Sequence, residues 1–146
     1  MWLYENKEIS SIEDIPQNTF GFIYIVTYKP TGTSYIGKKV LYHNQKKKLT
    51  KKELAEQTGP GRKPTTKVVT KESDWKTYYG SSKMIVEMIK NGEKDNFSRE
   101  ILMFVSKKKL LSYYETKYLF KHEVLETPGK FFNDNVAGKY YQKDFM

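Results

Sequence analysis

Residues 20–37 leave the fewest choices of conformation in this 146-residue chain. The segment FGFIYIVTY, residues 20–28, is apolar at successive positions and rich in aromatic and β-branched side chains, which favours a strand buried on both faces. In the next five residues, KPTGT, Pro30 fixes φ for a turn and Gly32 accepts a positive φ. SYIG, residues 34–37, resumes the extended pattern. The sequence therefore predicts a β-hairpin over residues 20–37.

Three further elements are predicted downstream of the hairpin. SSKMIVEMIKNG, residues 81–92, has serine at its start, an apolar stripe and a terminal Asn-Gly, as a helix does. FSREILMFV, residues 97–105, alternates like a strand, and residues 107–125 form a longer helix with apolar residues on one face. Residues 1–18 are too broken for a long element. We therefore expect an α/β fold in which helices flank a small three-stranded mixed or antiparallel sheet.

Positive charge is concentrated between the hairpin and the first of these helices. The chain has 26 Lys and Arg residues against 17 Asp and Glu residues, a formal net charge of +9. Twelve cationic and four acidic residues lie between positions 38 and 76, so this quarter of the chain holds most of the excess. Such a patch favours a polyanionic partner, because phosphate binding releases counterions. A basic surface that serves only solubility is the alternative.

The basic stretch, about residues 39–76, is the least regular part of the sequence. LTKKELAEQ, residues 49–57, is compatible with a short helix that begins after Thr50 and has Glu53 in the position of a capping box. GPGRKPTTK, residues 59–67, has the composition of a basic loop. We expect an insertion within a single domain that spans residues 1–146.

Cysteine and histidine counts exclude several kinds of catalytic site. Without cysteine the chain forms no disulfide, zinc–thiolate site or cysteine nucleophile. His43 and His122 leave little room for a histidine-rich metal site or a serine–histidine–aspartate triad. No apolar run approaches the ~20 residues that span a bilayer, and the N-terminal residues lack the apolar core of a signal peptide. We therefore expect no membrane partner and a cytoplasmic location.

The hairpin carries two short motifs. FIY at residues 22–24 and YIG at residues 35–37 place Tyr24 and Tyr35 eleven positions apart on the two predicted strands. These motifs and the turn between them resemble the paired motif of the GIY-YIG nuclease family, although Phe22 stands where the family has glycine. The later helix, strand and helix occupy the places of the family's following elements. The resemblance covers about residues 20–136 and implies the family's fold.

The resemblance also implies roles for particular residues. It makes Glu115, on the last predicted helix, the metal-binding carboxylate, with Mg²⁺ or Mn²⁺ as the cofactor. It implies that Tyr24 takes part in proton transfer and that Tyr35 orients a water molecule or the phosphate. Lys38 would neutralise the scissile phosphate, and Asn133 matches a catalytic asparagine. From the residues alone, Glu115 also fits a surface ion pair, and the tyrosines also fit simple packing of the hairpin.

One position departs from the family pattern. The family places an arginine ten residues after the second motif tyrosine, on its first helix, and this chain has Gln45 there. Arg62, Arg99 and Lys46 are the alternatives for supplying the missing positive charge. Tyr79 lies in an aromatic cluster that fits either base stacking or core packing. The further positions considered for phosphate or DNA binding are Gly37, Lys39, Lys46, Arg62 and Tyr79.

The function implied by the resemblance is metal-dependent endonucleolytic hydrolysis of double-stranded DNA, as a nick or a double-strand break with a 5′-phosphate. One active site cuts one strand, so a double-strand break requires a homodimer or two binding events. Homing endonucleases of the family carry a second DNA-binding module, and none is recognisable here, so target choice falls to residues 39–76 or to a partner. A small, lysine-rich chain fits a bacterial virus or mobile element.

Three other functions remain compatible with the sequence. The first is a DNA-binding module that has the same fold with weak or no catalysis, which the glutamine at position 45 favours. The second is a nuclease selective for RNA or for nucleic-acid structure. The third is a basic structural protein without an active site, for which Glu115 is dispensable.

Overall fold

The computed structural model describes residues 1–145, and Met146 lies outside the described residues. The chain divides into two compact units. One contains Met1–Leu41 together with the residues from Asp74 onward, and the other is Tyr42–Ser73.

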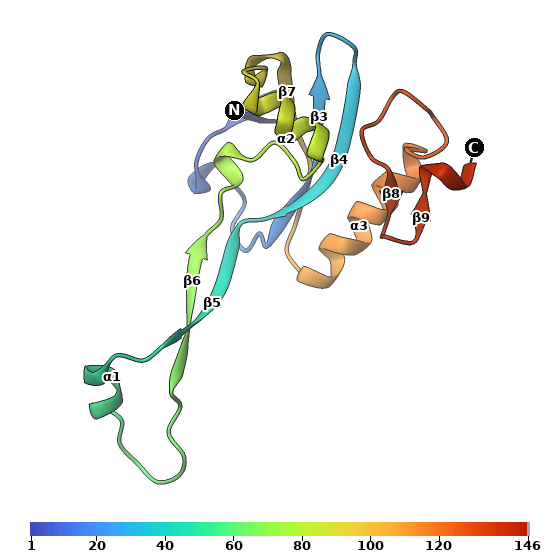
Figure 1. Ribbon diagram of the computed structural model, residues 1–146. Coiled ribbons are helices and arrows are strands. Elements are labelled where there is room, and N and C mark those ends of the chain that lie inside the picture. The colour runs from blue at the N-terminus through green and yellow to red at the C-terminus, as the bar shows by residue number, and fades with distance from the viewer. Residues whose placement is uncertain (146) are drawn as a thin grey trace. The chain divides into compact units, whose positions relative to one another are not determined.

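The first unit is built on a five-stranded mixed sheet (Figure 1). Its strands, in spatial order, are β2 (Lys7–Ile9), β1 (Trp2–Tyr4), β7 (Phe97–Val105), β3 (Gly21–Tyr28) and β4 (Thr33–Val40). β3 is antiparallel to both β4 and β7, and β1 is parallel to β7. The predicted hairpin and the strand at residues 97–105 are therefore confirmed.

The predicted three-stranded sheet is too small, because residues 1–18 add the strands β1 and β2. Trp2 anchors this addition: it is 1% exposed, and its indole Nε1 donates to the Trp75 carbonyl at 2.7 Å. β1 also pairs with β7, far along the chain. Three-residue strands show no periodicity of their own, so the short N-terminal segment resembled a lead-in.

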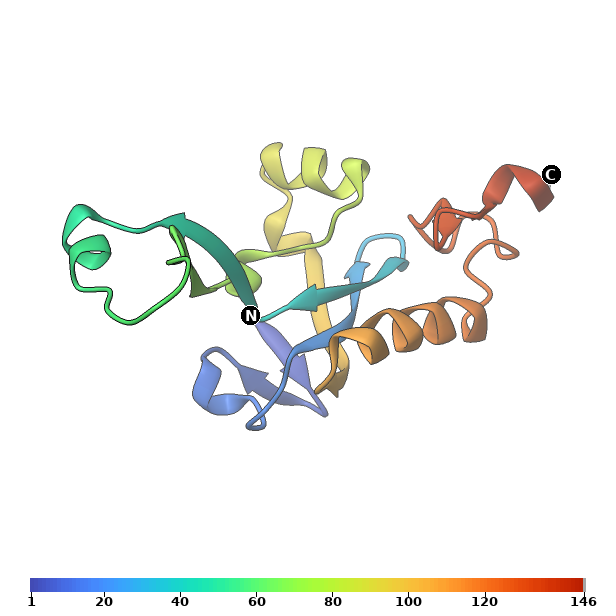
Figure 2. The ribbon, with the colours of Figure 1, turned by 90° about the horizontal axis from the view of Figure 1, so that it is seen from below.

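Two helices cover opposite faces of the sheet, as Figure 2 shows. α2 (Lys83–Lys90) buries Ile85 against the face that carries Phe22 and Tyr24, while α3 (Lys108–Lys121) buries Leu111 and Leu119 against the opposite face. β3 contributes to both layers, since its successive side chains point to opposite faces. This explains why its sequence is apolar throughout, and both predicted helices are confirmed.

The chain beyond α3 covers part of the free edge of β4. The Ser34 N–H donates to the Lys130 carbonyl at 2.9 Å, and the Phe132 N–H donates to the Ser34 carbonyl at 2.7 Å. The short strands β8 (Asn135–Val136) and β9 (Tyr140–Tyr141) follow and pair with each other. The 3₁₀ helices are η1 (Ile12–Asp14), η2 (Trp75–Thr77), η3 (Lys94–Asn96) and η4 (Gln142–Phe145).

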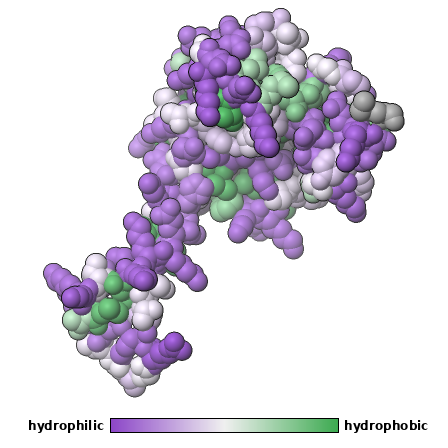
Figure 3. All heavy atoms as spheres, viewed as in Figure 1, coloured by the Kyte–Doolittle hydropathy of each residue, from purple (hydrophilic) through white to green (hydrophobic). Residues whose placement is uncertain are grey.

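The second unit is a two-stranded antiparallel ribbon with a short helix. β5 (Tyr42–Lys48) pairs with β6 (Thr66–Glu72), and α1 (Lys51–Ala55) lies between them in sequence. Thr50 and Glu53 form the predicted capping box. The strands were not predicted, because both their faces are exposed and they lack the alternation of a half-buried strand. Figure 3 shows hydrophilic side chains along the ribbon and a small hydrophobic patch near its α1 end.

No helix in the described part of the chain combines the length and the apolar character needed to cross a membrane.

Candidate active site

The ring of Tyr24 is fixed above Gly37 on the neighbouring strand. These two residues are direct partners in the β3–β4 register. A Cβ atom added to Gly37 would lie 2.4 Å from Tyr24 Oη and 2.7 Å from its Cζ, so only glycine leaves room for the ring. The glycine of the second motif therefore has a packing reason that is independent of any contact with phosphate.

Three tyrosines gather on this face of the sheet. The ring centroids of Tyr24 and Tyr35 are 6.3 Å apart, and those of Tyr24 and Tyr78 are 5.9 Å apart at right angles. Tyr35 Oη and Ser81 Oγ are hydrogen bonded at 2.7 Å. Sequence reasoning singled out Tyr79 rather than Tyr78, and it missed Ser81. Tyr78 and Tyr79 are adjacent residues that follow η2, and their order in the sequence gives no signal of which one faces the hairpin.

Burial controls the protonation of the two motif tyrosines. It raises the pKa of Tyr24 well above its ordinary value, and the nearby Tyr78, Tyr35 and Glu115 act in the same direction. Burial also raises the pKa of Tyr35, against the opposing effect of its hydrogen bond with Ser81. Both phenols are therefore neutral at pH 7, and a neutral phenol can either donate or accept a hydrogen bond.

Glu115 and Lys38 lie on the α3 side of β4. Lys38 Nζ donates to Ser112 Oγ at 2.7 Å, one turn before Glu115 on the same helix. Burial raises the pKa of the Glu115 carboxyl, and the charge and backbone amide of Lys38 oppose that rise. Lys39, by contrast, pairs with Asp74 at 2.5 Å, and its Nζ lies 3.9 Å from the centroid of the Tyr78 ring. The two lysines thus point to opposite faces, as strand alternation predicts.

A cavity of about 270 Å³ opens beside the edge of β4. Tyr35, Glu115, Asn133 and Asp134 contribute to its wall. Tyr24 does not line it. Carboxylate and amide oxygens are the ligands that Mg²⁺ and Mn²⁺ prefer, and Mg²⁺ commonly uses only one or two protein carboxylates. Among the described residues, no group of three or more histidine, aspartate or glutamate side chains could hold a metal ion, so Glu115 and Asp134 would suit only a cation that keeps much of its hydration.

The family model described as "Putative endonuclease segE, GIY-YIG domain" matches residues 2–136. This chain belongs to the GIY-YIG nuclease family. The match begins at residue 2, so it includes β1 and β2, which the resemblance starting at about residue 20 left out. No curated protein and no solved structure matched the chain.

The arginine expected in a GIY-YIG nuclease has no counterpart at position 45. Residues 42–48 form β5 rather than the family's first helix, so counting ten residues from Tyr35 leads to an exposed strand. Gln45, Lys46 and Arg62 all belong to the second unit. The ten-residue spacing that led to Gln45 therefore does not transfer to this chain, and Lys46 and Arg62 stay predictions as sources of the positive charge.

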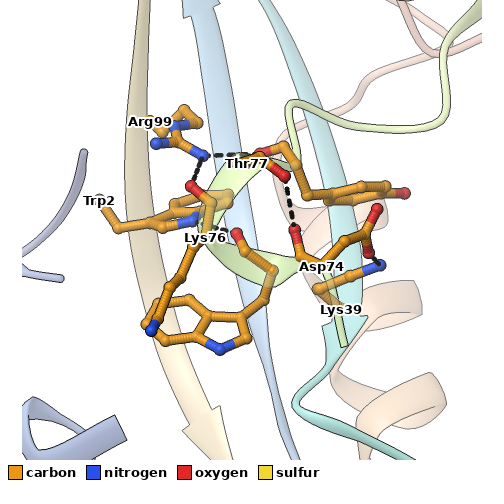
Figure 4. A network of polar contacts seen from close by, with 8 residues as sticks. Trp2, Lys39, Asp74, Lys76, Thr77 and Arg99 are labelled. Carbon is orange, nitrogen blue, oxygen red and sulfur yellow. Dashed lines mark hydrogen bonds and ion pairs between the residues drawn. The ribbon is translucent and has the colours of Figure 1, made fainter. Parts of the chain in front are cut away.

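Arg99 is engaged in holding a turn of the first unit. Its Nη1 donates to the carbonyls of Lys76 and Tyr78 at 3.0 and 2.9 Å (Figure 4). Its guanidinium lies 4.6 Å from the Trp2 ring and 4.2 Å from the Tyr79 ring. Arg99 is only 4% exposed, so it supports the segment that carries Tyr78 and Ser81. Tyr79 packs in the same cluster.

Asn133 is bound to the backbone of the edge strand. Its Oδ1 accepts from the Ile36 N–H at 3.0 Å, and its Nδ2 donates to the Ile36 carbonyl at 2.9 Å. The side chain is buried and continues the edge pairing that Lys130 begins at Ser34. Asn133 thus fixes the strand segment between Tyr35 and Gly37. A catalytic role for its amide stays a prediction.

Replacing Asn133 by alanine is expected to destabilise the fold. The change leaves the Ile36 N–H and carbonyl without their partners, and each buried unpaired group costs roughly 1–3 kcal/mol. Urea unfolding of the variant and the native protein measures the difference. Thr31→Ala, in the exposed turn of the same hairpin, is the control and should change stability little. Unchanged stability of Asn133→Ala together with lost cleavage would instead indicate a direct catalytic role.

Proposed function

We propose that this GIY-YIG nuclease is an endonuclease that hydrolyses double-stranded DNA with Mg²⁺ or Mn²⁺ held at Glu115. The observation that carries the proposal is the half-buried Glu115 carboxylate beside Lys38, on a cavity that Tyr35 also lines. Partial burial of an ionised carboxylate costs solvation free energy. This cost favours a role of Glu115 as a cation ligand over a role in a surface ion pair. The domain proposed is a single one over residues 1–146, with the basic stretch as an insertion.

The protein ligands proposed for the cation are Glu115 and, on the same cavity wall, Asp134. When bound, the ion would supply positive charge at the phosphate and a more acidic water. Lys38 adds a second positive charge on that side of β4 and offsets charge that develops on the phosphate oxygens. Binding and charge stabilisation by these residues are the main contributions to the proposed chemistry.

The two motif tyrosines are proposed to act differently. Tyr35 lines the cavity, so its neutral hydroxyl, oriented by Ser81, is the phenol that can contact a water or phosphate oxygen. Tyr24 is buried and its pKa is raised, which opposes a role as proton acceptor at neutral pH. Tyr24 instead positions Tyr35 and Tyr78 through ring contacts.

The concentration of positive charge in residues 38–76 supports DNA as the substrate. A double-strand break would need a homodimer or two successive encounters, because one site cuts one strand. The composition also supports a protein of a bacterial virus or mobile element that acts in the cytoplasm of a bacterial or phage-infected cell.

The proposal is tested by incubating the native protein with supercoiled plasmid in Mg²⁺, in Mn²⁺ and in EDTA. We expect nicked or linear plasmid with either cation and intact plasmid in EDTA. The ends should be joined by DNA ligase without prior phosphorylation, since the product proposed carries a 5′-phosphate. An RNA duplex of matched sequence tests the alternative substrate. If Mg²⁺ only shifts the mobility of the plasmid, the protein binds DNA without cutting it, and the proposed activity is wrong.

A further inference from the structure

We infer that the β5–β6 ribbon enters the major groove of double-stranded DNA and reads base edges there. This inference rests on the proposed function, because it takes DNA as the partner. It goes further in assigning target selection to the middle of one face of the ribbon, where Asn44, Lys46, Val68 and Thr70 form two neighbouring cross-strand pairs. This set of four residues is called the reading face below.

The ribbon exposes side chains on both faces. Every residue of β5 is exposed, and on β6 only Val69 is partly buried. An isolated pair of strands gains little from its own packing. Val68 is 64% exposed within a cationic segment, where an apolar side chain gains nothing from water. The ribbon therefore has the properties of a surface that a partner covers.

The strand register determines which side chains share a face. Asn44 pairs with Thr70, and two residues further along Lys46 pairs with Val68. Because alternate residues of a strand point to the same face, these four side chains form one contiguous patch. Thr70 Oγ1 donates to Asn44 Oδ1 at 3.0 Å, a bond that does not use the N–H donors of the Asn44 amide.

The opposite face of the ribbon is partly engaged within the second unit. Lys67 on that face pairs with Glu53 of α1 at 2.6 Å, and Val69 there is the partly buried residue of β6. Gln45 also lies on that face, as the partner of Val69. The reading face is thus the more open of the two and the better one for contact with a groove.

The chemistry of the reading face suits base edges. Asparagine bonds to adenine, lysine to guanine, threonine to either, and an apolar group contacts the thymine methyl. All these groups are exposed in the major groove, which is wide enough for a two-stranded ribbon. The strands are seven residues each, roughly 20 Å at the usual rise, so they can follow the groove over several base pairs.

Charge on the rest of the second unit complements DNA. Residues 42–73 contain nine cationic and three acidic side chains. Eight of the nine cationic residues lie outside the reading face, on β5, α1, the following loop and β6: Lys47, Lys48, Lys51, Lys52, Arg62, Lys63, Lys67 and Lys71. Contacts of this kind with phosphates position a protein on the duplex, while base contacts give sequence preference.

The test is selection of bound duplexes from a random-sequence pool. The full chain is used with the substitution Glu115→Gln, so that bound duplexes are not cut during the selection. We expect this protein to enrich a defined sequence. Adding Asn44→Ala and Val68→Ala should lower its preference for that sequence over unrelated DNA about tenfold or more. Gln45→Ala, on the opposite face of the same strand, should leave the preference unchanged. Circular dichroism confirms that each variant is folded.

A second measurement identifies the groove. Uracil in place of thymine removes the major-groove methyl group. This replacement should weaken DNA binding by the protein that keeps Val68, and it should weaken binding by the Val68→Ala variant less. Enrichment of no sequence, equal effects of the two faces, or equal binding of duplex RNA would each overturn the inference. Failure of the proposed nuclease activity is distinguished from these results, since it appears as an uncut plasmid with the native protein in Mg²⁺.

Discussion

Replacing Glu115 by glutamine is expected to lower the rate of plasmid cleavage in Mg²⁺ by about 10³-fold, the scale seen when one essential electrostatic group is removed. The amide keeps the size of the side chain but loses the charge that holds the cation. DNA affinity should stay within a few-fold, because the basic residues of the second unit are unchanged. Single-turnover cleavage over a range of Mg²⁺ concentrations, together with fluorescence anisotropy of labelled DNA, measures both quantities.

The same substitution should make the metal-free protein more stable at pH 7. Burial raises the pKa of Glu115 in the fold, so the folded state holds this proton more tightly than the unfolded state. The ionised carboxylate therefore lowers stability at a pH above both pKa values, and glutamine removes that cost. The gain should disappear as the pH falls below the unfolded pKa, about 4.3.

Thermal unfolding in EDTA at pH 7 and at pH 4 checks this expectation. Glu126→Gln is the matched control, because Glu126 is an exposed carboxylate shortly after the same helix. It should change neither the melting temperature nor the cleavage rate. Cleavage retained by Glu115→Gln would exclude the proposed metal site, and an unchanged melting temperature would show that the carboxylate is not held at a cost.

The predictable parts of the fold are those whose sequence pattern reports their surroundings. In FGFIYIVTY both alternating sets of side chains are mostly apolar, because β3 lies between two layers and each set packs into one of them. The periodicity of residues 81–92 likewise reflects one buried face, whereas α3 buries Leu111 and Leu119 but leaves Leu110, Tyr113 and Phe120 exposed. β1 gave no such signal, because Trp2 is held by a carbonyl 73 positions away. The ribbon gave none either, since all its strand residues except the partly buried Val69 are exposed.

The resemblance led to residues that the fold brings together, their catalytic roles stay predictions, and its ten-residue spacing to the arginine does not transfer. Tyr24, Tyr35 and Glu115 come together around the edge of β4, with Tyr35 and Glu115 on one cavity. The arginine position failed because ten residues after Tyr35 the chain is a strand instead of a helix. The contact of Asn133 with Ile36 joins residues 97 positions apart, which no local pattern encodes.

Replacing Gly37 by alanine is expected to damage both stability and cleavage. The new Cβ would meet Tyr24 Oη at 2.4 Å and Tyr35 Cε1 at 3.1 Å. Tyr24 has little room to move, because Trp2 and Tyr78 pack against its ring with centroids 5.5 and 5.9 Å away. Overpacking of this kind costs roughly 1–3 kcal/mol. The free energy of unfolding measured in urea and the cleavage rate per folded molecule should both decrease.

Gly32→Ala is the matched control for this substitution. Gly32 lies in the turn of the same hairpin, and a Cβ there meets nothing within 4 Å, but its φ of +74° disfavours other residues. Alanine at this position should lower stability through the backbone alone and leave cleavage per folded molecule unchanged. A similar loss of cleavage in both variants would mean that the hairpin, and not the contact with Tyr24, limits activity.

A double-mutant cycle identifies the atom responsible. Tyr24→Phe removes Oη, the atom nearest to the added Cβ, while the ring carbon at 2.7 Å stays. Gly37→Ala should therefore cost less in the Tyr24→Phe protein than in the native one, with a coupling energy of about 0.5–3 kcal/mol, as for residues in contact. Strict additivity would contradict the steric explanation. A coupling energy in this range would show that the second motif requires glycine at position 37 because the Tyr24 side chain of the first motif fills the space of a Cβ atom.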